Sequence, residues 1–381
     1  MQYTEYELGE LLPFEQPTAY IVKSTDYSDA YATPVLTAGK SFILGKTNET
    51  DGIFDQLPVI IFDDFTTATQ FVNFRFKVKS SAMKILHINT DLVIPKYIFY
   101  RLQIIQFDHS THKRYWIQSY SKIKVLIPPL DEQFRIVARI EELFSELDKA
   151  VDTLKTTKEQ LEVYRQAVMK DAFQEKESII RLGDAIEKPR YGTSKKCDYP
   201  CTANSTAVLR IPNIDTKNGR VDSSDLKYAE FNEKELEQLN LKNGDILIIR
   251  SNGSISLVGS SAIIRKCDTD KTYAGYLMRL RILNKEKLLP KYLLYYLSSP
   301  DARRYIESVA KSTSGVNNIN SQEISKLCVP LSSIEKQEKT VAEIEMKLSV
   351  YHEIEKSVDT VLVQADAMRQ SILKQAFEGT M

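Results

Sequence analysis

Two short stretches near the N-terminus contain residue types that bind phosphate or metal, and each lacks part of the pattern that such a site needs. Residues 37–41, Thr-Ala-Gly-Lys-Ser, have the ending of a phosphate-binding P-loop, but Pro34 stands where that loop begins with glycine. Asp63 and Asp64 offer two carboxylates to a cation, and no third carboxylate follows at a useful spacing. We therefore expect a β-turn whose Lys40 can reach a phosphate, and a strand end followed by a loop of hydroxyl donors.

The other candidates for catalysis are also incomplete. Cys197 and Cys201 are four residues apart, with no histidine or second cysteine pair at the spacing of a zinc site. Residues 345–347 have the Glu-x-Lys form of a nuclease motif, but they lie on a helical apolar stripe without a suitable upstream aspartate. The four histidines have no triad or ligand spacing, and neither a glycine-rich S-adenosylmethionine loop nor an Asn/Asp-Pro-Pro-Tyr element occurs. The sequence therefore predicts neither a catalytic residue nor a metal site.

Basic side chains gather in particular segments. The chain carries 51 basic and 51 acidic residues, yet residues 71–124 hold ten basic and two acidic side chains, and residues 242–330 hold fourteen and seven. A basic half in each block is the usual footprint of a phosphate-binding surface. The predicted DNA contacts are loop and strand residues of types that bind phosphates or base edges: Lys40, Thr66, Thr67, Arg75, Lys77, Lys79, Lys113, Arg114, Arg190, Lys195, Lys196, Arg250, Asn252, Arg303 and Arg304.

Residues 71–79, Phe-Val-Asn-Phe-Arg-Phe-Lys-Val-Lys, alternate as a β-strand does. The alternation predicts that Arg75, Lys77 and Lys79 point to one face of a single strand. That face is either a charged edge that prevents association between sheets or a basic surface turned to DNA. The sequence leaves both interpretations open.

Two long helices must position these segments. From Gln133 to Phe173, apolar residues recur at heptad spacing without glycine or proline, which predicts a helix with a coiled-coil seam. The seam consists of Ile140, Leu147, Leu154, Leu161 and Val168, with Val137, Phe144 and Val151 alongside. Adding 204 to the first five numbers gives Ile344, Tyr351, Val358, Ala365 and Ile372.

The two helices are copies of one repeat. Residues 133–174 and 337–378 share 13 identities in 42 positions without a gap, so the repeat has a period of about half the chain. Polar residues near the end of each copy recur where a solvated helix face would not need them. We predict that these residues bind a partner: Arg165, Gln166 and Lys170 in the first copy, and Arg369, Gln370 and Lys374 in the second.

The repeat also predicts the architecture. A 42-residue helix is about 63 Å long, whereas a block of this size is about 30–40 Å across. Only a few residues join the first helix to the second block, so an antiparallel helix pair with one block at each end fits the connection. The predicted fold is α+β, with two domains of short strands and helices separated by an antiparallel coiled coil and related by a pseudo-two-fold repeat. The predicted segments are 1–130, 131–176, 177–330 and 331–381.

Composition indicates the compartment. Four cysteines in 381 residues do not suggest a disulfide framework. Residues 1–5 lack the pattern of a signal peptide, and no apolar run approaches the roughly 18 residues of a membrane span. We expect a soluble cytoplasmic protein with no membrane partner.

The junctions between blocks and helices resemble those of the specificity subunits of type I restriction–modification systems. The signatures are Ile-Pro-Pro-Leu-Asp-Glu-Gln at 127–133, Val-Pro-Leu…Glu-Lys-Gln at 329–337, Arg-Gln-Ala…Ala-Phe at 165–173 and Arg-Gln-Ser…Ala-Phe at 369–377. Residues 34–39 and 61–67 are also similar to pieces of the family's target-recognition domains. The resemblance covers the whole chain, although the second helix start has three extra residues and Lys336 in place of Glu132.

This resemblance implies a non-catalytic subunit that binds double-stranded DNA. Residues 1–130 and 177–330 would be target-recognition domains, each reading one half of an asymmetric, interrupted target. The spacer helices would fix the distance between the halves and dock two methyltransferase subunits, which restriction subunits join. No cofactor would belong to this chain, because S-adenosylmethionine, ATP and Mg would bind the partner subunits.

Two other functions remain open on the residues alone. A coiled-coil adaptor that joins two protein partners would not bind duplex DNA in a salt-dependent manner. A stand-alone methyltransferase would transfer methyl groups without a partner, but the sequence lacks the motifs of that class.

Overall fold

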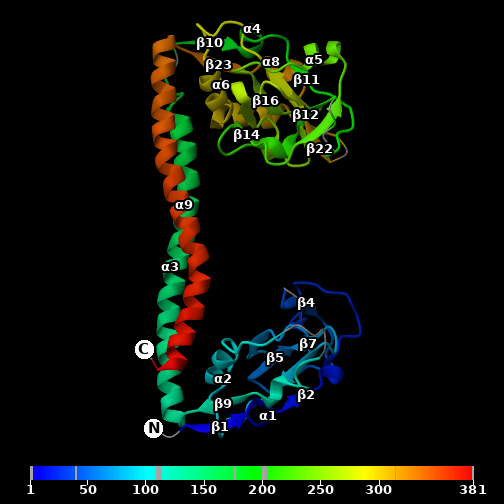
Figure 1. The fold of residues 1–381 in the computed structure, drawn as a ribbon, viewed down its shortest axis with the longest axis vertical. Helices are drawn as coiled ribbons and strands as arrows, with labels where there is room; N and C mark the ends of the chain where they lie inside the picture. The colour runs from blue at the N-terminus through cyan, green and yellow to red at the C-terminus, as the bar shows by residue number, and fades with distance from the viewer. Residues whose placement is uncertain are drawn as a thin grey trace. The chain divides into compact units, whose positions relative to one another are not determined.

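The computed structural model describes residues 3–38, 41–108, 114–175, 177–199, 202, 204–313 and 315–379. The chain divides into two compact units (Figure 1). Unit 1 comprises Met1–Lys155 and Asp359–Met381, and unit 2 comprises Thr156–Val358. Each unit therefore contains one globular block and a part of each long helix.

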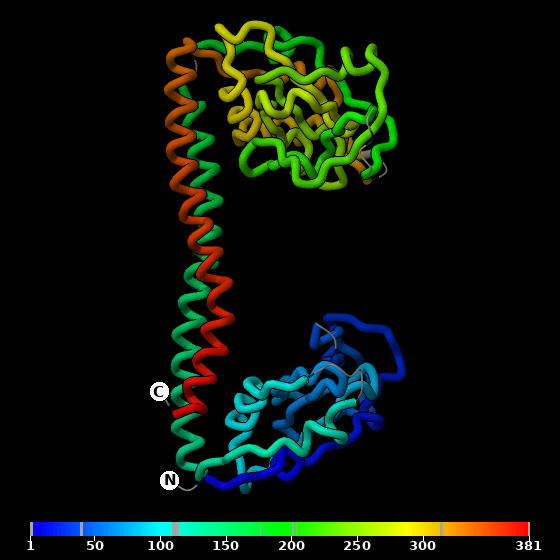
Figure 2. Tube along the Cα trace, viewed as in Figure 1, coloured from blue at the N-terminus to red at the C-terminus, as the bar shows by residue number. Residues whose placement is uncertain are grey.

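Unit 1 is built on a four-stranded antiparallel sheet of order β2-β8-β5-β6, beside a three-stranded sheet of order β4-β3-β7. A separate antiparallel pair, β1 and β9, precedes the long helix α3, and Figure 2 shows the blue first strand beside the cyan-green ninth. The strands are β1 (Thr4–Glu7), β2 (Phe14–Glu15), β3 (Thr33–Leu36), β4 (Ile43–Thr47), β5 (Val59–Asp63), β6 (Thr69–Val72), β7 (Lys77–Val78), β8 (Met83–Leu86) and β9 (Lys124–Ile127). The short α-helices are α1 (Leu8–Leu11) and α2 (Pro95–Leu102), and α3 spans Leu130–Asp171.

Unit 2 repeats this plan with additions. Its four-stranded sheet has the order β11-β20-β16-β18, its three-stranded sheet the order β15-β12-β19, and β10 pairs with β23 before the long helix α9. Two small sheets, β13-β14 and β17-β22-β21, are added. The strands are β10 (Ser178–Arg181), β11 (Arg190–Tyr191), β12 (Ser205–Leu209), β13 (Ile214–Asp215), β14 (Arg220–Val221), β15 (Lys227–Glu230), β16 (Ile246–Ile249), β17 (Ser251–Asn252), β18 (Ser261–Ile263), β19 (Thr272–Tyr273), β20 (Leu277–Leu280), β21 (Lys311–Thr313), β22 (Val316–Asn318) and β23 (Cys328–Leu331). The α-helices are α4 (Leu182–Ala185), α5 (Glu233–Leu239), α6 (Pro290–Leu297), α7 (Pro300–Val309), α8 (Ser321–Ser325) and α9 (Ile334–Glu378).

The two long helices pack antiparallel within each unit. In unit 1, Ile140 of α3 clusters with Leu373 and Ala376 of α9, while Asp148 pairs with Arg369. A later residue of α3 thus contacts an earlier residue of α9, as expected for antiparallel helices. In unit 2, the Tyr351 hydroxyl donates to Glu162 at 2.7 Å. The predicted α+β fold, helix pair and repeat are confirmed.

A buried glutamine fixes the start of each long helix. Gln133 and Gln337 are fully buried, and each side chain bonds one backbone N–H and two backbone carbonyls at 2.8–3.0 Å. The bonded groups are Ile94 N–H, Leu92 O and Pro128 O in unit 1, and Leu289 N–H, Lys287 O and Ser332 O in unit 2. These bonds tie the helix start to the segment that leads into α2 or α6. Breaking them would leave buried polar groups without a partner, which costs free energy.

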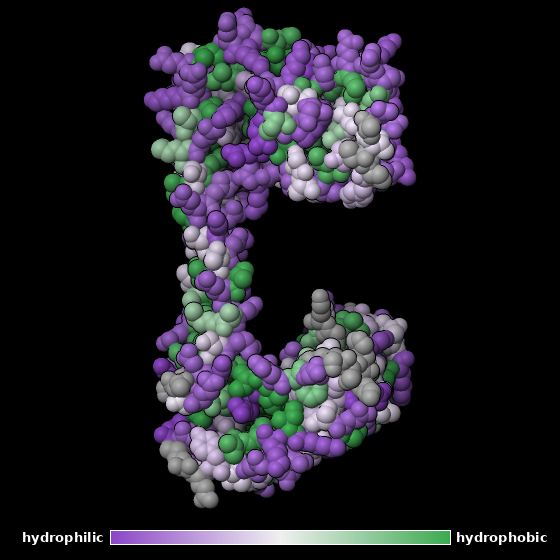
Figure 3. Space-filling view, viewed as in Figure 1, coloured by the Kyte–Doolittle hydropathy of each residue, from purple (hydrophilic) through white to green (hydrophobic). Residues whose placement is uncertain are grey.

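An aromatic helix in each unit packs against the end of a long helix. Both α2 and α6 begin with proline, whose fixed φ suits the first helical position. The Tyr97 ring of α2 lies edge-on to Phe377, with centroids 5.2 Å apart, and Tyr292 of α6 lies edge-on to Phe173 at 5.1 Å. The repeated aromatic segment is therefore a core element in both units. Figure 3 shows hydrophilic residues over most of the visible surface, with hydrophobic patches between them.

Residues 71–79 do not form the single strand predicted from their alternation. Strand β6 ends at Val72, and β7 contains only Lys77 and Val78. The two strands belong to different sheets, since β6 pairs antiparallel with β5 whereas β7 pairs parallel with β3. The prediction of one shared face for Arg75, Lys77 and Lys79 is wrong, because the chain leaves the first sheet between the two strands.

Candidate nucleic-acid interface

The tip of β16 in unit 2 presents an arginine from a rigid base. Gly244, with a φ of +92° that favours glycine, forms the turn before the strand, and all four residues of β16 are buried. Arg250 follows directly; its backbone N–H donates to Tyr276 O, and its carbonyl accepts from Ile319 N–H, both at 2.9 Å. The half-buried Arg250 side chain therefore begins from a backbone that is hydrogen-bonded on both sides.

Two asparagines lie on β17, which follows this arginine, and on its partner strand β22. Asn252 pairs in register with Asn317, and Asn317 Nδ2 donates to Gly253 O at 2.9 Å. The Asn252 carboxamide oxygen accepts from Ser254 N–H at 2.8 Å. Asn252 and Asn317 are half-buried. Tyr276, whose carbonyl accepts from the Arg250 backbone N–H, is 61% exposed. Arginine, amide and aromatic groups of this kind are those that contact bases and phosphates.

The other predicted basic residues of unit 2 differ in how strongly they are held. Lys195 pairs with Glu235 at 2.7 Å, and Arg190 Nη2 donates to Gln238 at 2.9 Å. Arg303 donates to the carbonyl of Val258 at 2.6 Å and therefore supports the 3-10 turn η4 (Ile255–Leu257) rather than reaching outward. Lys196 and Arg304 remain exposed at 88% and 75% of their side chains, although each has an acidic neighbour.

The corresponding tip in unit 1 is a tight hairpin between β5 and β6. Asp63 ends β5, and its carboxylate accepts from Phe65 N–H at 2.9 Å and from the Thr66 hydroxyl at 2.6 Å. Thr67 has a φ of +59°, uncommon for a branched residue. The predicted strand end with hydroxyl residues is confirmed. The Thr66 hydroxyl bonds within the turn, and Phe65 is 47% exposed at the tip.

Lys77 is buried and ion-paired in unit 1. Its ammonium lies 3.2 Å from Glu49 and 2.5 Å from Asp51 O, and its side chain is 2% exposed. It therefore cannot contact DNA in this conformation, and its predicted place on a basic face is wrong. Lys79 is half-buried with its ammonium 5.8 Å from the centre of the Tyr27 ring, whereas Arg75 and Arg114 are exposed. Lys40, Lys113 and Cys201 lie outside the described residues.

The predicted partner-binding residues divide into two kinds. Gln166, Lys170, Gln370 and Lys374 are exposed. Arg369 instead pairs with Asp148 and lies over the Phe144 ring at 5.0 Å. Arg165 donates to Lys217 O at 3.1 Å. The arginines thus hold parts of their own unit together, and the glutamines and lysines remain open to a partner.

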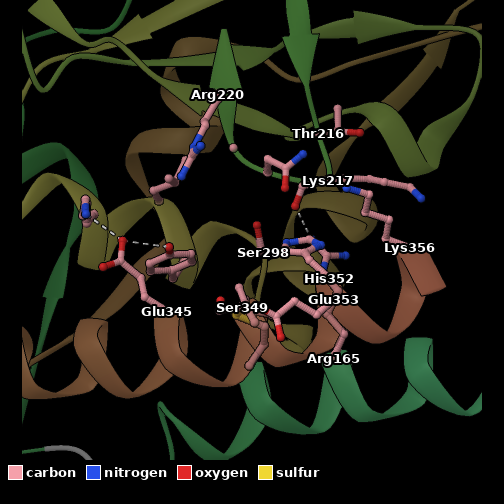
Figure 4. A pocket seen from close by; sticks show the side chains of 17 residues that line it. Arg165, Thr216, Lys217, Arg220, Ser298, Glu345, Ser349, His352, Glu353 and Lys356 are labelled. Carbon is pink, nitrogen blue, oxygen red and sulfur yellow. Dashed lines mark hydrogen bonds and ion pairs between the residues drawn. The ribbon is translucent and has the colours of Figure 1, made fainter. Parts of the chain in front are cut away.

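Arg165 lines a pocket of about 620 Å³ within unit 2, between the β13–β14 turn, α6 and the long helices (Figure 4). Figure 4 shows Arg165 rising from α3, Arg220 descending from β14, and His352 on α9. Lys217 closes one side through an ion pair with Glu355 at 3.0 Å. Burial alone would raise the pKa of Glu355, but the hydrogen bond and attraction from Lys217 outweigh it and hold that pKa below its ordinary value.

Unit 1 has a pocket of about 580 Å³ at the equivalent place, with different charges. Its lining includes Arg369, the counterpart of Arg165, together with Asp148 and Asp152. The positions 204 residues later are His352 and Lys356. The two halves of the repeat therefore each have a pocket at this site, but the charges that line the two pockets differ.

No cluster of three or more potential metal ligands occurs among the described residues. Within that same part of the chain, no helix combines the length and the apolar character that a bilayer crossing requires.

Comparison with known proteins identifies the family. Residues 176–356 match the model described as the type I restriction modification DNA specificity domain. The chain is 35% identical over 360 residues to the EcoR124I/EcoR124II specificity subunit of Escherichia coli, an alignment that covers 88% of this chain and 84% of that protein. The chain belongs to the specificity subunits of type I restriction–modification systems.

Other members of this family have lower sequence identity to this chain. The EcoKI specificity subunit of Escherichia coli strain K12 is 29% identical over 278 residues, which cover 69% of this chain and 59% of that protein. Among solved structures, the HsdS subunit from Thermoanaerobacter tengcongensis has the same fold, with a TM-score of 0.55 at 16% identity over 100% of this chain and 97% of that chain. A chain from a structure of complex assembly and conformational transition of the type I R-M system has a TM-score of 0.68 at 17% identity, covering 98% and 97%.

A specificity subunit is a non-catalytic component that recognises DNA sequence, so the absence of catalytic motifs agrees with the family. Sequence reasoning missed two kinds of residue in this specificity subunit. Tyr191, whose ring lies beside Arg250, gave no signal because it is far from Arg250 in the chain. The buried bonds of Gln133 and Gln337 were also missed, although their identity in the repeat was a usable signal.

Proposed function

We propose that this specificity subunit reads one asymmetric, interrupted duplex target, with residues 1–130 binding one half and residues 177–330 the other. The observation that carries the proposal is that one scaffold occurs twice with different tips. The residue after β5 is Asp64, which forms a buried ion pair with Lys84 at 3.3 Å. The residue after β16 is Arg250, whose side chain is half-buried. Equal scaffolds with unequal tips suit two half-sites of unequal sequence.

The same proposal assigns the helices 131–176 and 331–381 to spacing and assembly. Two methyltransferase subunits would dock on the two copies of the helix repeat, at the exposed Gln166, Lys170, Gln370 and Lys374. Restriction subunits would join through them. S-adenosylmethionine, ATP and Mg would then bind those partners, and the complex would work in the cytoplasm, where the DNA lies.

The direct test is equilibrium binding of the chain to duplex DNA over a range of salt concentrations. We expect the logarithm of the binding constant to fall linearly with the logarithm of salt concentration, because bound cations are released from phosphates. Replacing the exposed Arg75 by Gln should lower the magnitude of that slope by about one unit.

Lys124 provides the matched control, since it is exposed but paired with Glu5 on the β1–β9 ribbon. Lys124→Gln should leave the slope unchanged. Binding that shows no salt dependence, or no duplex binding at all, would favour a coiled-coil adaptor instead.

A further inference from the structure

Arg250 differs in its surroundings from three other arginines of unit 2. Arg210, Arg265 and Arg281 each pair with an aspartate at 2.7–3.1 Å. No carboxylate of the described residues lies within ion-pair distance of Arg250. A half-buried cation without a carboxylate is costly, so its position calls for another reason.

The guanidinium is nonetheless held in a defined plane. Its centre lies 4.4 Å from the centre of the Tyr191 ring, and Nη1 donates to Gly275 O at 3.2 Å. Tyr191 is itself fixed, because β11 pairs with β20 and the Tyr191 hydroxyl accepts from Ser321 N–H at 2.9 Å. Nε is buried without a partner among the described residues. The stack and one hydrogen bond therefore orient the group. Apart from the buried Nε–H, three N–H donors on Nη1 and Nη2 have no bond to the described residues.

On the basis of the proposed function, we propose that Arg250 reads a guanine in the major groove of the half-site bound by unit 2, and that Tyr191 is its positioning residue. Guanine presents two acceptors, O6 and N7, in the major groove, and a planar guanidinium matches them with two parallel N–H donors. Stacking on Tyr191 removes most of the rotamer freedom that a free arginine would lose on binding. Asn252 lies two residues after Arg250 and pairs in register with Asn317, and amides of this type suit neighbouring base edges.

The equivalent position in unit 1 lacks this capacity. Asp64 is fully engaged inside its unit, by Lys84 at 3.3 Å and by Trp116 N–H at 2.9 Å. The counterpart of Arg250 in unit 1 therefore cannot make this contact, and the proposed guanine contact belongs to the half-site of unit 2.

The test uses the complex of the full chain with its methyltransferase subunit, selected against duplexes randomised at each target position and sequenced. Arg250→Lys keeps the charge but loses the bidentate fork, so preference for guanine at one position should fall about tenfold or more. Tyr191→Leu should relax the same position, and Tyr191→Phe, which keeps the ring, should retain most of the preference. Arg181→Lys, at an exposed arginine of strand β10 outside the predicted DNA contacts, is the control and should change no position.

Several outcomes would overturn the inference. An unchanged preference in Arg250→Lys, or a uniform loss of affinity at all sequences in Arg250→Ala, would assign Arg250 to a phosphate. A wild-type target whose unit 2 half contains no guanine would also overturn it while leaving the proposed function intact. A wild-type complex without any sequence preference would instead overturn the proposed function. Thermal unfolding and retention of the unit 1 half-site show whether each variant is folded.

Discussion

Tyr120 in unit 1 and Tyr273 in unit 2 are buried phenols, and burial raises the pKa of each from 10.0 to about 12. In the unfolded chain both ionise near pH 10, so the folded pKa lies above the unfolded one. The stability that they contribute is therefore complete below about pH 10 and is lost as pH rises from about 10 to 12. Alkaline titration should show tyrosinate absorbance from exposed tyrosines first, and a last step that accompanies loss of helical circular dichroism.

Tyr120→Phe and Tyr273→Phe provide the controls for this titration. Each should diminish the last step, because each removes one buried phenol. Ionisation of every tyrosine near pH 10 with the helical signal intact would contradict the burial of these two rings.

The buried glutamines are the second residue-scale feature. Gln133→Leu removes the partner of one backbone N–H and two carbonyls, so we expect the free energy of unfolding to fall by about 1–3 kcal/mol. Gln337→Leu should behave alike. Gln166→Leu, at an exposed position of the same helix α3, should change stability by no more than about 0.5 kcal/mol. Denaturant unfolding measures all three, and a Gln133→Leu value equal to that of Gln166→Leu would refute the role of the buried bonds.

At the scale of elements, the exposed lysines that recur 204 residues apart test how partners bind. Lys170→Glu combined with Lys374→Glu reverses both charges outside the buried seam. We expect fewer methyltransferase subunits per chain, because two repeated contacts become repulsive toward a partner that accommodated lysine. Native mass spectrometry of the complex measures this stoichiometry.

Lys155→Glu makes the same charge change on α3 at an exposed site whose repeat counterpart is Asp359. It should leave the stoichiometry unchanged. A double variant that still binds two methyltransferase subunits would show that these lysines are not part of the docking surface.

The elements also show what a sequence can predict. The long helices follow from heptad spacing, since local periodicity decides which residues of a helix are buried, and Ile140 and Ile344 are accordingly 0% and 1% exposed. The alternation at 71–79 misleads because the side of a strand that is buried depends on distant partners. Lys77 is buried by Glu49, and Arg250 is held by Tyr191, and neither partner is close in sequence. Contacts between residues that are far apart in sequence can be identified only once the fold is known.

At the scale of the whole molecule, the proposed role of the helices as a spacer has a geometric consequence. Inserting four residues after Leu154 and after Val358 would lengthen each helix by roughly 6 Å, with a rotation of about 40°. Both insertions fall at the boundary between the two units. Since duplex DNA rises about 3.4 Å per base pair, the gap between half-sites should grow by one or two base pairs. A methylation map that retains the old gap, or changes the half-sites themselves, would show that the helices do not set the distance.

The most direct test of bipartite recognition is the map of methylated adenines in cells that express the chain with its methyltransferase subunit. The wild-type chain should give one asymmetric target interrupted by a gap. A chain whose residues 1–130 come from another family member should change one half of that target and preserve the other half, because α3 begins at Leu130 and each unit has its own core. A continuous target, or a swap that changes both halves together, would contradict the proposal that each unit reads one half independently.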